Sequence, residues 1–514
     1  MRTVFTILII TVLAWLVLAC NSTNGRSNIQ LEPVWIEHLE PSPGSLKIGV
    51  VGSFPYKDLH KVISEWATLY GPGPSYSRLM KFAMDAKTAS YMPVVCDLCN
   101  SFEKIDSTTY EFNLNQQHQF YFAEEQALRP VTGSDVIFSL NRMNELDSPH
   151  KILVDSIESI ELLSPFQIRF NLKYPDPDFF LKLASPYAVI IPEEFDVIES
   201  IPGSGPWIYS RGQSGQTNLH SASNHPGGTG SLKIEFLIAA NQEMVLRMLK
   251  TGLVDVARIP ESYWTEFEQD GFQSVVVNRQ GRGVIFGLNS NRAPFNNLET
   301  RQRIFSGLNP FSAIEESFGI GEISTGLPLA SSDWQLPKHK IMKAFNGIEA
   351  ELIQIEKPFV LVIANFGDDY IKHGELLISQ LKEKGAKVEA EIVTRAEYLE
   401  RVWLDKDYDA FVGPLPPTDL PNHFALGFIH SMGEMNVTGG SPILDEVVEK
   451  FAKEDDPSIR ADLANTLQEE LLKHSLFFMA AGLAERWVLN DSVQNFIPAM
   501  PMGAGDLWSN LQKQ

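Results

Sequence analysis

Between residues 359 and 412 the sequence alternates regularly between strand and helix patterns. Short apolar runs at 359–364, 388–393 and 408–412 predict three strands. The two stretches between them, 370–384 and 396–404, carry apolar residues at helical spacing. This order predicts a parallel sheet with helices on its faces, because parallel strands need crossover connections. The chain is therefore expected to have an α/β fold.

Other segments support the same fold class. An alternating strand is predicted over 108–114, and Thr132 and Asp135 form a capping box that begins a helix. Residues 232–259 indicate a strand, a helix opened by Asn241 and a second strand. Two helices are predicted near the C-terminal end, with apolar faces formed by Leu444, Val447, Val448 and Phe451 and by Ile459, Leu463, Leu467 and Leu471.

Length and charge limit the class of protein. A chain of 514 residues suggests roughly three domains or two large lobes. The formal net charge of -22 would repel phosphate backbones, and no cluster of lysine and arginine offsets it. We therefore expect no nucleic-acid partner.

The N-terminal residues resemble a secretion signal of the bacterial lipoprotein type. Arg2 precedes an apolar run over 4–18, which at about fifteen residues is shorter than the roughly 20 needed to span a bilayer. We expect cleavage after Ala19 and lipid modification of Cys20, followed by a polar tether up to residue 44. An uncleaved N-terminal anchor helix is the alternative. Either way the rest of the chain lies outside the cytoplasm, anchored to a bacterial membrane.

Two further cysteines, Cys96 and Cys99, are separated by two residues. In an oxidising compartment such a pair favours a local disulfide, and two packed thiols are the next interpretation. A zinc site would need two more ligands, and the sequence has no second cysteine pair. We expect neither a metal nor another cofactor.

Short motifs along residues 46–490 resemble the family 5 extracellular solute-binding proteins, which are peptide, oligopeptide and nickel receptors of ABC importers. Each motif is weak alone, and their common order is the specific signal. In chain order they are Tyr76-Ser-Arg-Leu79, Cys96-Asp-Leu-Cys99, Thr109-Tyr-Glu-Phe-Asn-Leu114, Thr132-Gly-Ser-Asp135, Gly203-Ser-Gly-Pro206-Trp207, Gly252-Leu-Val-Asp255, Gly287-Leu-Asn289, Pro294-Phe295, Arg301-Gln302, Tyr408-Asp409 and Leu444-Asp445.

The resemblance implies a two-lobed periplasmic-binding-protein type II fold with an extra subdomain inserted in the first lobe. The expected division is a signal peptide over 1–19, the lipidated cysteine and tether over 20–44, a first lobe over 45–75, 166–281 and 480–514, an inserted subdomain over 76–165 and a second lobe over 282–479. It also implies a monomer that captures a small solute, peptide-like or otherwise polar, and delivers it to an ABC permease in the membrane.

Two departures from the family pattern concern the ligand. The strand over 109–114 is followed by Asn115, where the family usually has arginine. Peptide receptors carry a Gly-Trp-x-x-Asp segment whose aspartate binds a peptide's amino terminus. Here residues 413–419 lack the tryptophan and place proline near that position, and Asp419 also fits the later Asp-Pro of that segment. The sequence thus leaves open whether the ligand is a peptide.

Candidate ligand residues come from both lobes. Asp419 and His423 lie on a proline-rich loop after the third strand, where open α/β sheets place their binding crevices; a solvated loop carboxylate is the alternative for Asp419. Trp207 follows the glycine turn and either stacks on a ligand or closes the core. Gly203 and Gly205 either cradle a ligand or permit a tight turn.

Three more residues complete this set. Arg282 lies where the chain should cross between lobes and either pairs with an anionic ligand or forms an ion pair between the lobes. Asn289 and Tyr76 belong to motifs shared with the family. We expect the crevice to be lined by residues of this set.

The sequence offers no constellation for catalysis. It contains no phosphate-binding loop, no Gly-x-Ser-x-Gly elbow and no His-Glu-x-x-His. The chain is therefore not expected to be an enzyme. The rival to transport is a surface sensor or chaperone-like interaction protein on the same scaffold, and neighbouring permease and ATPase genes would discriminate the two.

Overall fold

In the computed structural model, residues 44–514 form one compact unit. The structure describes residues 45–513 except 53–57, 83–93, 122–126, 146–147, 195–201, 212–215, 223–224, 227–232, 279–282, 320, 328–333, 346–357, 416–419, 495, 497–507 and 509–511.

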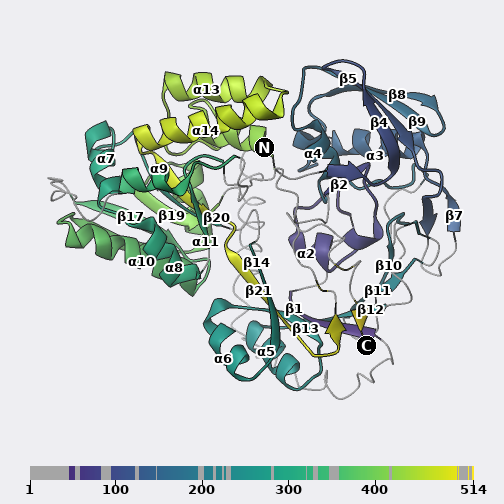
Figure 1. Ribbon diagram of the computed structural model, residues 1–514, viewed down its shortest axis with the longest axis horizontal. Coiled ribbons are helices and arrows are strands. Elements are labelled where there is room, and N and C mark those ends of the chain that lie inside the picture. The colour runs from purple at the N-terminus through teal and green to yellow at the C-terminus, as the bar shows by residue number, and fades with distance from the viewer. Residues whose placement is uncertain are drawn as a thin grey trace, which may run out of the picture. The chain divides into compact units, whose positions relative to one another are not determined.

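A seven-stranded sheet is built from segments far apart in the chain (Figure 1). Its central strand β1 (Ser45–Val51) runs parallel to both neighbours, β12 and β13, and the other pairs are antiparallel. The strands in spatial order are β10 (Trp207–Arg211), β11 (Thr217–Ser221), β12 (Lys233–Ala239), β1, β13 (Val256–Ile259), β21 (Ala484–Leu489) and β14 (Gln273–Asn278).

A six-stranded sheet contains the predicted βαβαβ unit. Strand β17 lies between β18 and β19 and is parallel to both, which confirms the parallel pairing predicted for these three strands. The remaining pairs of the sheet are antiparallel. Helix α10 (Asp368–Glu383) connects β17 to β18 and packs on both strands. The strands in spatial order are β16 (Glu322–Ser324), β20 (Phe477–Ala481), β15 (Gly283–Leu288), β19 (Ala410–Pro414), β17 (Phe359–Ala364) and β18 (Val388–Val393).

The inserted subdomain has its own four-stranded antiparallel sheet, ordered β4 (Cys99–Lys104), β5 (Thr109–Leu114), β9 (Gln167–Leu172) and β8 (Ile157–Ser164). Strand β9 pairs with both β5 and β8, so the subdomain extends at least to Leu172. The boundary expected at 165 is too early. It falls in the tight turn between β8 and β9, and the alternation of β9 alone does not say which sheet it joins.

Helices begin largely where their capping residues predict. The Asp135 carboxylate accepts from the backbone and hydroxyl of Thr132 at the start of α3 (Gly133–Met143), and the Asn241 side chain caps α5 (Gln242–Lys250). The other α-helices are α2 (Glu65–Leu69), α4 (Phe179–Ala184), α6 (Trp264–Gln269), α7 (Leu298–Ser306), α8 (Pro310–Phe318), α9 (Lys338–Met342), α11 (Arg395–Tyr398), α12 (Pro421–Phe424), α13 (Pro442–Lys453) and α14 (Pro457–His474).

Short strands complete the described fold: β2 (Met80–Phe82) pairs with β3 (Val94–Cys96), β6 (Gln119–Tyr121) with β7 (Ala127–Pro130), and β22 (Val493–Gln494) with β23 (Gln512–Lys513). Aromatic side chains fill the cores around the sheets. Trp508 packs on Phe236 of the seven-stranded sheet, and its indole N–H donates to the Leu69 carbonyl at 2.7 Å. A C-terminal residue thus closes the core that the first strand begins.

Candidate ligand-binding site

Loops that follow parallel strands are the natural place for a ligand in this architecture. Ligands of open α/β sheets bind outside the carboxyl ends of the strands. In the seven-stranded sheet this end lies beyond Val51 of β1, and in the six-stranded sheet beyond Ala364, Val393 and Pro414.

The glycine turn before β10 is held by close backbone packing. The Gly205 N–H donates to the Ser75 carbonyl at 2.9 Å, and the Gly203 carbonyl accepts from the Tyr121 N–H at 2.8 Å. A Cβ atom at Gly203 would lie 1.8 Å from the Ser75 oxygen. Both glycines therefore permit a close approach of two backbone segments, and the Gly205 amide already has an acceptor within the protein.

Trp207 and Tyr76 are both buried next to this turn. Trp207 is the first residue of β10, is 1% exposed and belongs to the main hydrophobic core. Within the described part of the chain its buried indole N–H has no hydrogen-bond acceptor. Tyr76 packs with Val189 and Ile191, and burial raises the pKa of its hydroxyl, so the phenol stays neutral. Both side chains close the core beside the turn.

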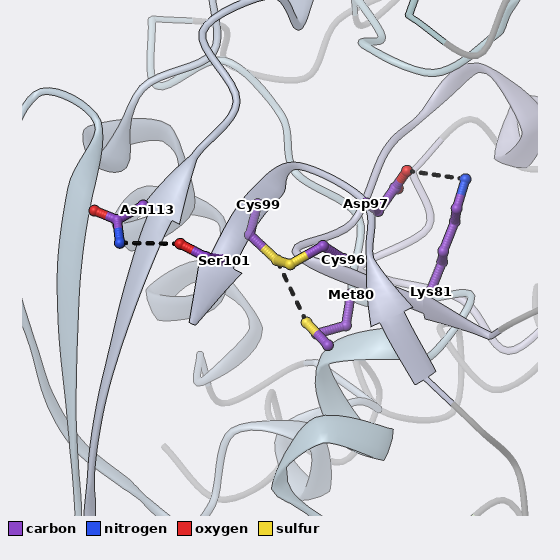
Figure 2. Close-up of a disulfide and its surroundings, with 7 residues drawn as sticks. All are labelled: Met80, Lys81, Cys96, Asp97, Cys99, Ser101 and Asn113. Atoms are coloured by element: carbon purple, nitrogen blue, oxygen red, sulfur yellow. Dashed lines mark hydrogen bonds and ion pairs between the residues drawn. A yellow bond between two sulfur atoms is a disulfide. The ribbon is translucent and has the colours of Figure 1, made fainter. Parts of the chain in front are cut away.

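Cys96 and Cys99 form a disulfide across the turn that contains Asp97, whose side chain points toward Lys81 (Figure 2). The Asp97 carboxylate accepts from the Arg78 N–H at 2.8 Å and lies 3.7 Å from the Lys81 ammonium. Burial alone would raise the pKa of Asp97, but the charges of Lys81 and Arg78 and the Arg78 N–H bond hold it below its usual value. The covalent ring and the buried carboxylate together fix this turn, and neither cysteine carries a free thiol.

Three predicted site residues, Cys20, Asp419 and Arg282, lie outside the described residues. His423 is described and lies half-buried in α12, shortly after β19. Burial lowers the pKa of its imidazole, while nearby Asp155 opposes this shift and Lys182 reinforces it. Its neutral ring can therefore donate or accept a hydrogen bond at neutral pH.

Asn289 has a structural role in the described fold. Its side-chain amide donates to the carbonyls of Lys406 and Tyr408 at 3.2 and 3.1 Å, and its side-chain oxygen accepts from the Asn291 N–H at 3.1 Å. The residue is 4% exposed. These bonds tie the end of β15 to the segment before β19, at the amino end of that strand, which is opposite the expected ligand side.

A buried network missed by the sequence analysis joins α4 to α12 and α14. The Asp178 carboxylate accepts from the Asn422 N–H at 2.7 Å and from the Arg460 guanidinium at 2.6 Å. The sequence places Ile459 on the buried face of α14, but Ile459 is 51% exposed and Arg460 is buried. Leu467 and Leu471 of the predicted face are buried as expected, so the difference concerns the start of the helix, where Arg460 is buried in place of Ile459. Isolated charged residues give no pattern from which this network could be found.

In the described part of the chain, no helix is long and apolar enough to cross a bilayer. The same residues contain no group of three or more histidine, cysteine, aspartate or glutamate side chains arranged to hold a metal ion.

Two large sheets and an inserted subdomain define a periplasmic-binding-protein type II fold. A family model for bacterial extracellular solute-binding proteins, family 5, middle, matches residues 94–435, which is more than half of the chain. The protein belongs to this family. Its members are extracytoplasmic solute-binding proteins and not enzymes. The match therefore confirms the family expected from the sequence motifs.

Individual relatives are distant. Di/tripeptide-binding protein 2 of Pseudomonas aeruginosa is 26% identical over 276 residues, which cover 48% of this chain and 51% of that protein. The match thus spans about half of that relative's length. Crystal structures of AppA from Clostridium difficile and of the ABC transporter substrate-binding protein CtaP from Listeria monocytogenes share the fold.

These two structures align over nearly their whole length. AppA has a TM-score of 0.77 at 15% identity and covers 91% of this chain and 100% of its own. CtaP has a TM-score of 0.74 at 18% identity and covers 91% of this chain and 99% of its own. At these identities the likeness establishes the fold alone.

Proposed function

We propose that the protein is a lipid-anchored substrate-binding protein that captures a small polar solute and delivers it to an ABC importer. The match of residues 94–435 to the family 5 model carries this proposal. The first lobe is assigned to the seven-stranded sheet and the second to the six-stranded sheet. The protein acts as a monomer, and a membrane permease is its partner.

In the second lobe the solute is assigned to the carboxyl ends of the parallel strands, where Asp419 and His423 follow β19. In the first lobe Trp207 and Tyr76 are candidates beside the glycine turn, and the strand pairing aligns Trp207 with the amino end of β12. Arg282 precedes β15, where the chain enters the six-stranded sheet. Asn289 is omitted from the ligand set because its polar atoms are engaged within the fold. A peptide-like solute is supported by the name of the Pseudomonas aeruginosa relative.

Native mass spectrometry of the protein purified from its source tests this function. The expected result is a small molecule that stays bound under native conditions and is released on denaturation. Substitution Asp419→Ala should weaken binding of that molecule by about 1 to 3 kcal/mol, the usual cost of leaving a buried partner unpaired. The control is Asp405→Ala, an exposed carboxylate before β19, which should bind as the wild type does. Equal affinity of the two variants would remove Asp419 from the site.

Lipid anchoring has its own test. Cys20 is the proposed acylation site, so Cys20→Ser should abolish labelling with radioactive palmitate and release the protein from membranes. Undiminished labelling of the variant would contradict the anchor. This outcome is independent of solute binding, because the anchor precedes the family match.

A further inference from the structure

Helix α12 begins without a capping residue of its own. Pro421 occupies its first turn, and the preceding Leu420 provides no side-chain acceptor. The first amides of any helix lack acceptors within that helix. The Asn422 N–H is such an amide, and its acceptor is the carboxylate of Asp178, which directly precedes α4. A residue 244 positions earlier thus performs the capping.

Arg460 of α14 fixes this carboxylate from the other side. Its guanidinium donates to Asp178 at 2.6 Å and to the Asn422 side-chain oxygen at 2.7 Å. Its planar group also lies over the rings of Phe451 and Trp334, at 4.7 and 5.2 Å. Asp178 is 0% exposed and Arg460 is 5% exposed. Each buried charge is therefore tolerated only while its partner is present, because an unpaired buried charge strongly destabilises the folded state.

The neighbouring Asp176 provides a contrast within the same segment. Its carboxylate is also buried and pairs with the Lys182 ammonium at 2.7 Å, but Lys182 belongs to α4 itself. Lys182 has a second partner in Asp155, at 2.6 Å. Within the described part of the chain, the hydrogen bonds of the Asp176 carboxylate stay within its own segment and include one from the Asp178 N–H at 3.0 Å, which an asparagine oxygen can also accept. By contrast, Asp178 also reaches the segment that follows β19.

We propose that Asp178 is a positioning residue for solute binding: it caps α12 and, with Arg460, holds His423 in place beside the start of α4. This inference rests on the proposed function, which assigns His423 to the ligand site. Deletion of the cap would leave the cores intact and loosen the start of α12. His423 would then sample several positions, and bound solute would leave faster.

Hydrogen–deuterium exchange of the full chain, without added ligand, tests the positioning. Asp178→Asn leaves Arg460 without a charged partner and can fail to fold, so a second variant, Asp178→Leu with Arg460→Met, removes both charges together. The double variant should unfold within a few degrees of the wild type. Exchange in peptides covering residues 420–430 should be at least about tenfold faster, the change expected when about 1.4 kcal/mol of local protection is lost. Exchange in β1 and β12 should not change.

Asp176→Asn is the matched control, and residues 420–430 should exchange at the wild-type rate in that variant. The proposal would be overturned if residues 420–430 exchanged at the wild-type rate in the double variant. It would also be overturned if Asp176→Asn accelerated their exchange as much as the double variant does. Native mass spectrometry after dialysis then measures retention of any co-purified molecule, which should fall in the double variant and not in the control. A wild-type protein that retains no molecule argues against the proposed function, while the exchange result still decides the positioning.

Discussion

The glycine turn at residues 203–207 and the start of α12 are both loops beside the proposed ligand site, and they are held by different forces. The turn is fixed by one backbone hydrogen bond to Ser75 and one to Tyr121, and it approaches Ser75 at a distance that only glycine permits. Helix α12 is held by a buried charge pair that comes from two other elements. Changes in the turn should therefore act through the backbone, and changes at α12 through unpaired charge.

The largest effect is expected for Arg460→Met, which leaves Asp178 buried without its charged partner. Breaking a buried pair in this way costs about 3 to 5 kcal/mol, so the free energy of unfolding in urea should fall by that amount. The control is Arg247→Met on α5, whose pair with Glu243 is exposed and should contribute less than about 0.5 kcal/mol. Similar losses in the two variants would contradict the role of burial.

Gly203→Ala tests how closely the glycine turn packs against the neighbouring backbone. The new methyl group would overlap the Ser75 carbonyl, and overpacking of this kind should cost about 2 to 3 kcal/mol of unfolding free energy. Gly252→Ala is the control, because that site has open space and only its positive φ is unfavourable to alanine. It should lose about 1 kcal/mol. A smaller loss at Gly203 than at Gly252 would show that the segments are not closely packed.

The disulfide should contribute less than either of these interactions. It closes a ring of only four residues, from Cys96 to Cys99, so the loop-entropy relation gives about 2 kcal/mol for Cys96→Ser with Cys99→Ser. Retention of solute should not change, because Asp97 keeps its ties to Lys81 and Arg78. Loss of solute from a variant that remains folded would give the disulfide a direct part in binding.

Acid should gradually lower the stability of the region around the glycine turn and of the core of the six-stranded sheet. Burial lowers the pKa of His225, near the glycine turn, and of His373, in the core of the six-stranded sheet, from 6.5 to about 4. The unfolded chain therefore takes up protons first, so this stability is complete above pH 6.5 and is lost as the pH falls toward 4. Each histidine contributes up to about 1.4 kcal/mol per pH unit.

His373→Phe should reduce this acid dependence in urea unfolding measured at pH 7, 6 and 5. The same substitution at His339, which is exposed on α9, serves as the control and should leave the slope unchanged. An unchanged slope in the His373 variant would show that its imidazole does not titrate differently in the folded state.

Regular elements could be predicted from the sequence because their causes are local. The strand at 109–114, the capping box of α3 and the βαβαβ unit depend on residues a few positions apart, and the structure confirms them. The burial of Arg460 could not be predicted in the same way. It depends on Asp178, 282 positions earlier, and the pattern of α14 alone favours burial of Ile459.

The candidate site was predictable only in part, for a related reason. The position of His423 after a parallel strand follows from strand order, which the sequence indicates. Whether a conspicuous residue is available to a ligand depends on its distant partners. The polar groups of Asn289 and the amide of Gly205 are occupied by segments that the sequence does not place beside them.

Small-angle X-ray scattering, with and without the molecule that co-purifies with the protein, tests the central claim most directly. A protein that encloses its solute between two lobes should have a smaller radius of gyration when that molecule is bound. The radius of gyration of Asp405→Ala should decrease as that of the wild type does. Asp419→Ala should need a higher concentration of the co-purified molecule to show the same decrease. A radius of gyration that is unchanged at saturating solute would contradict closure of the lobes around a ligand.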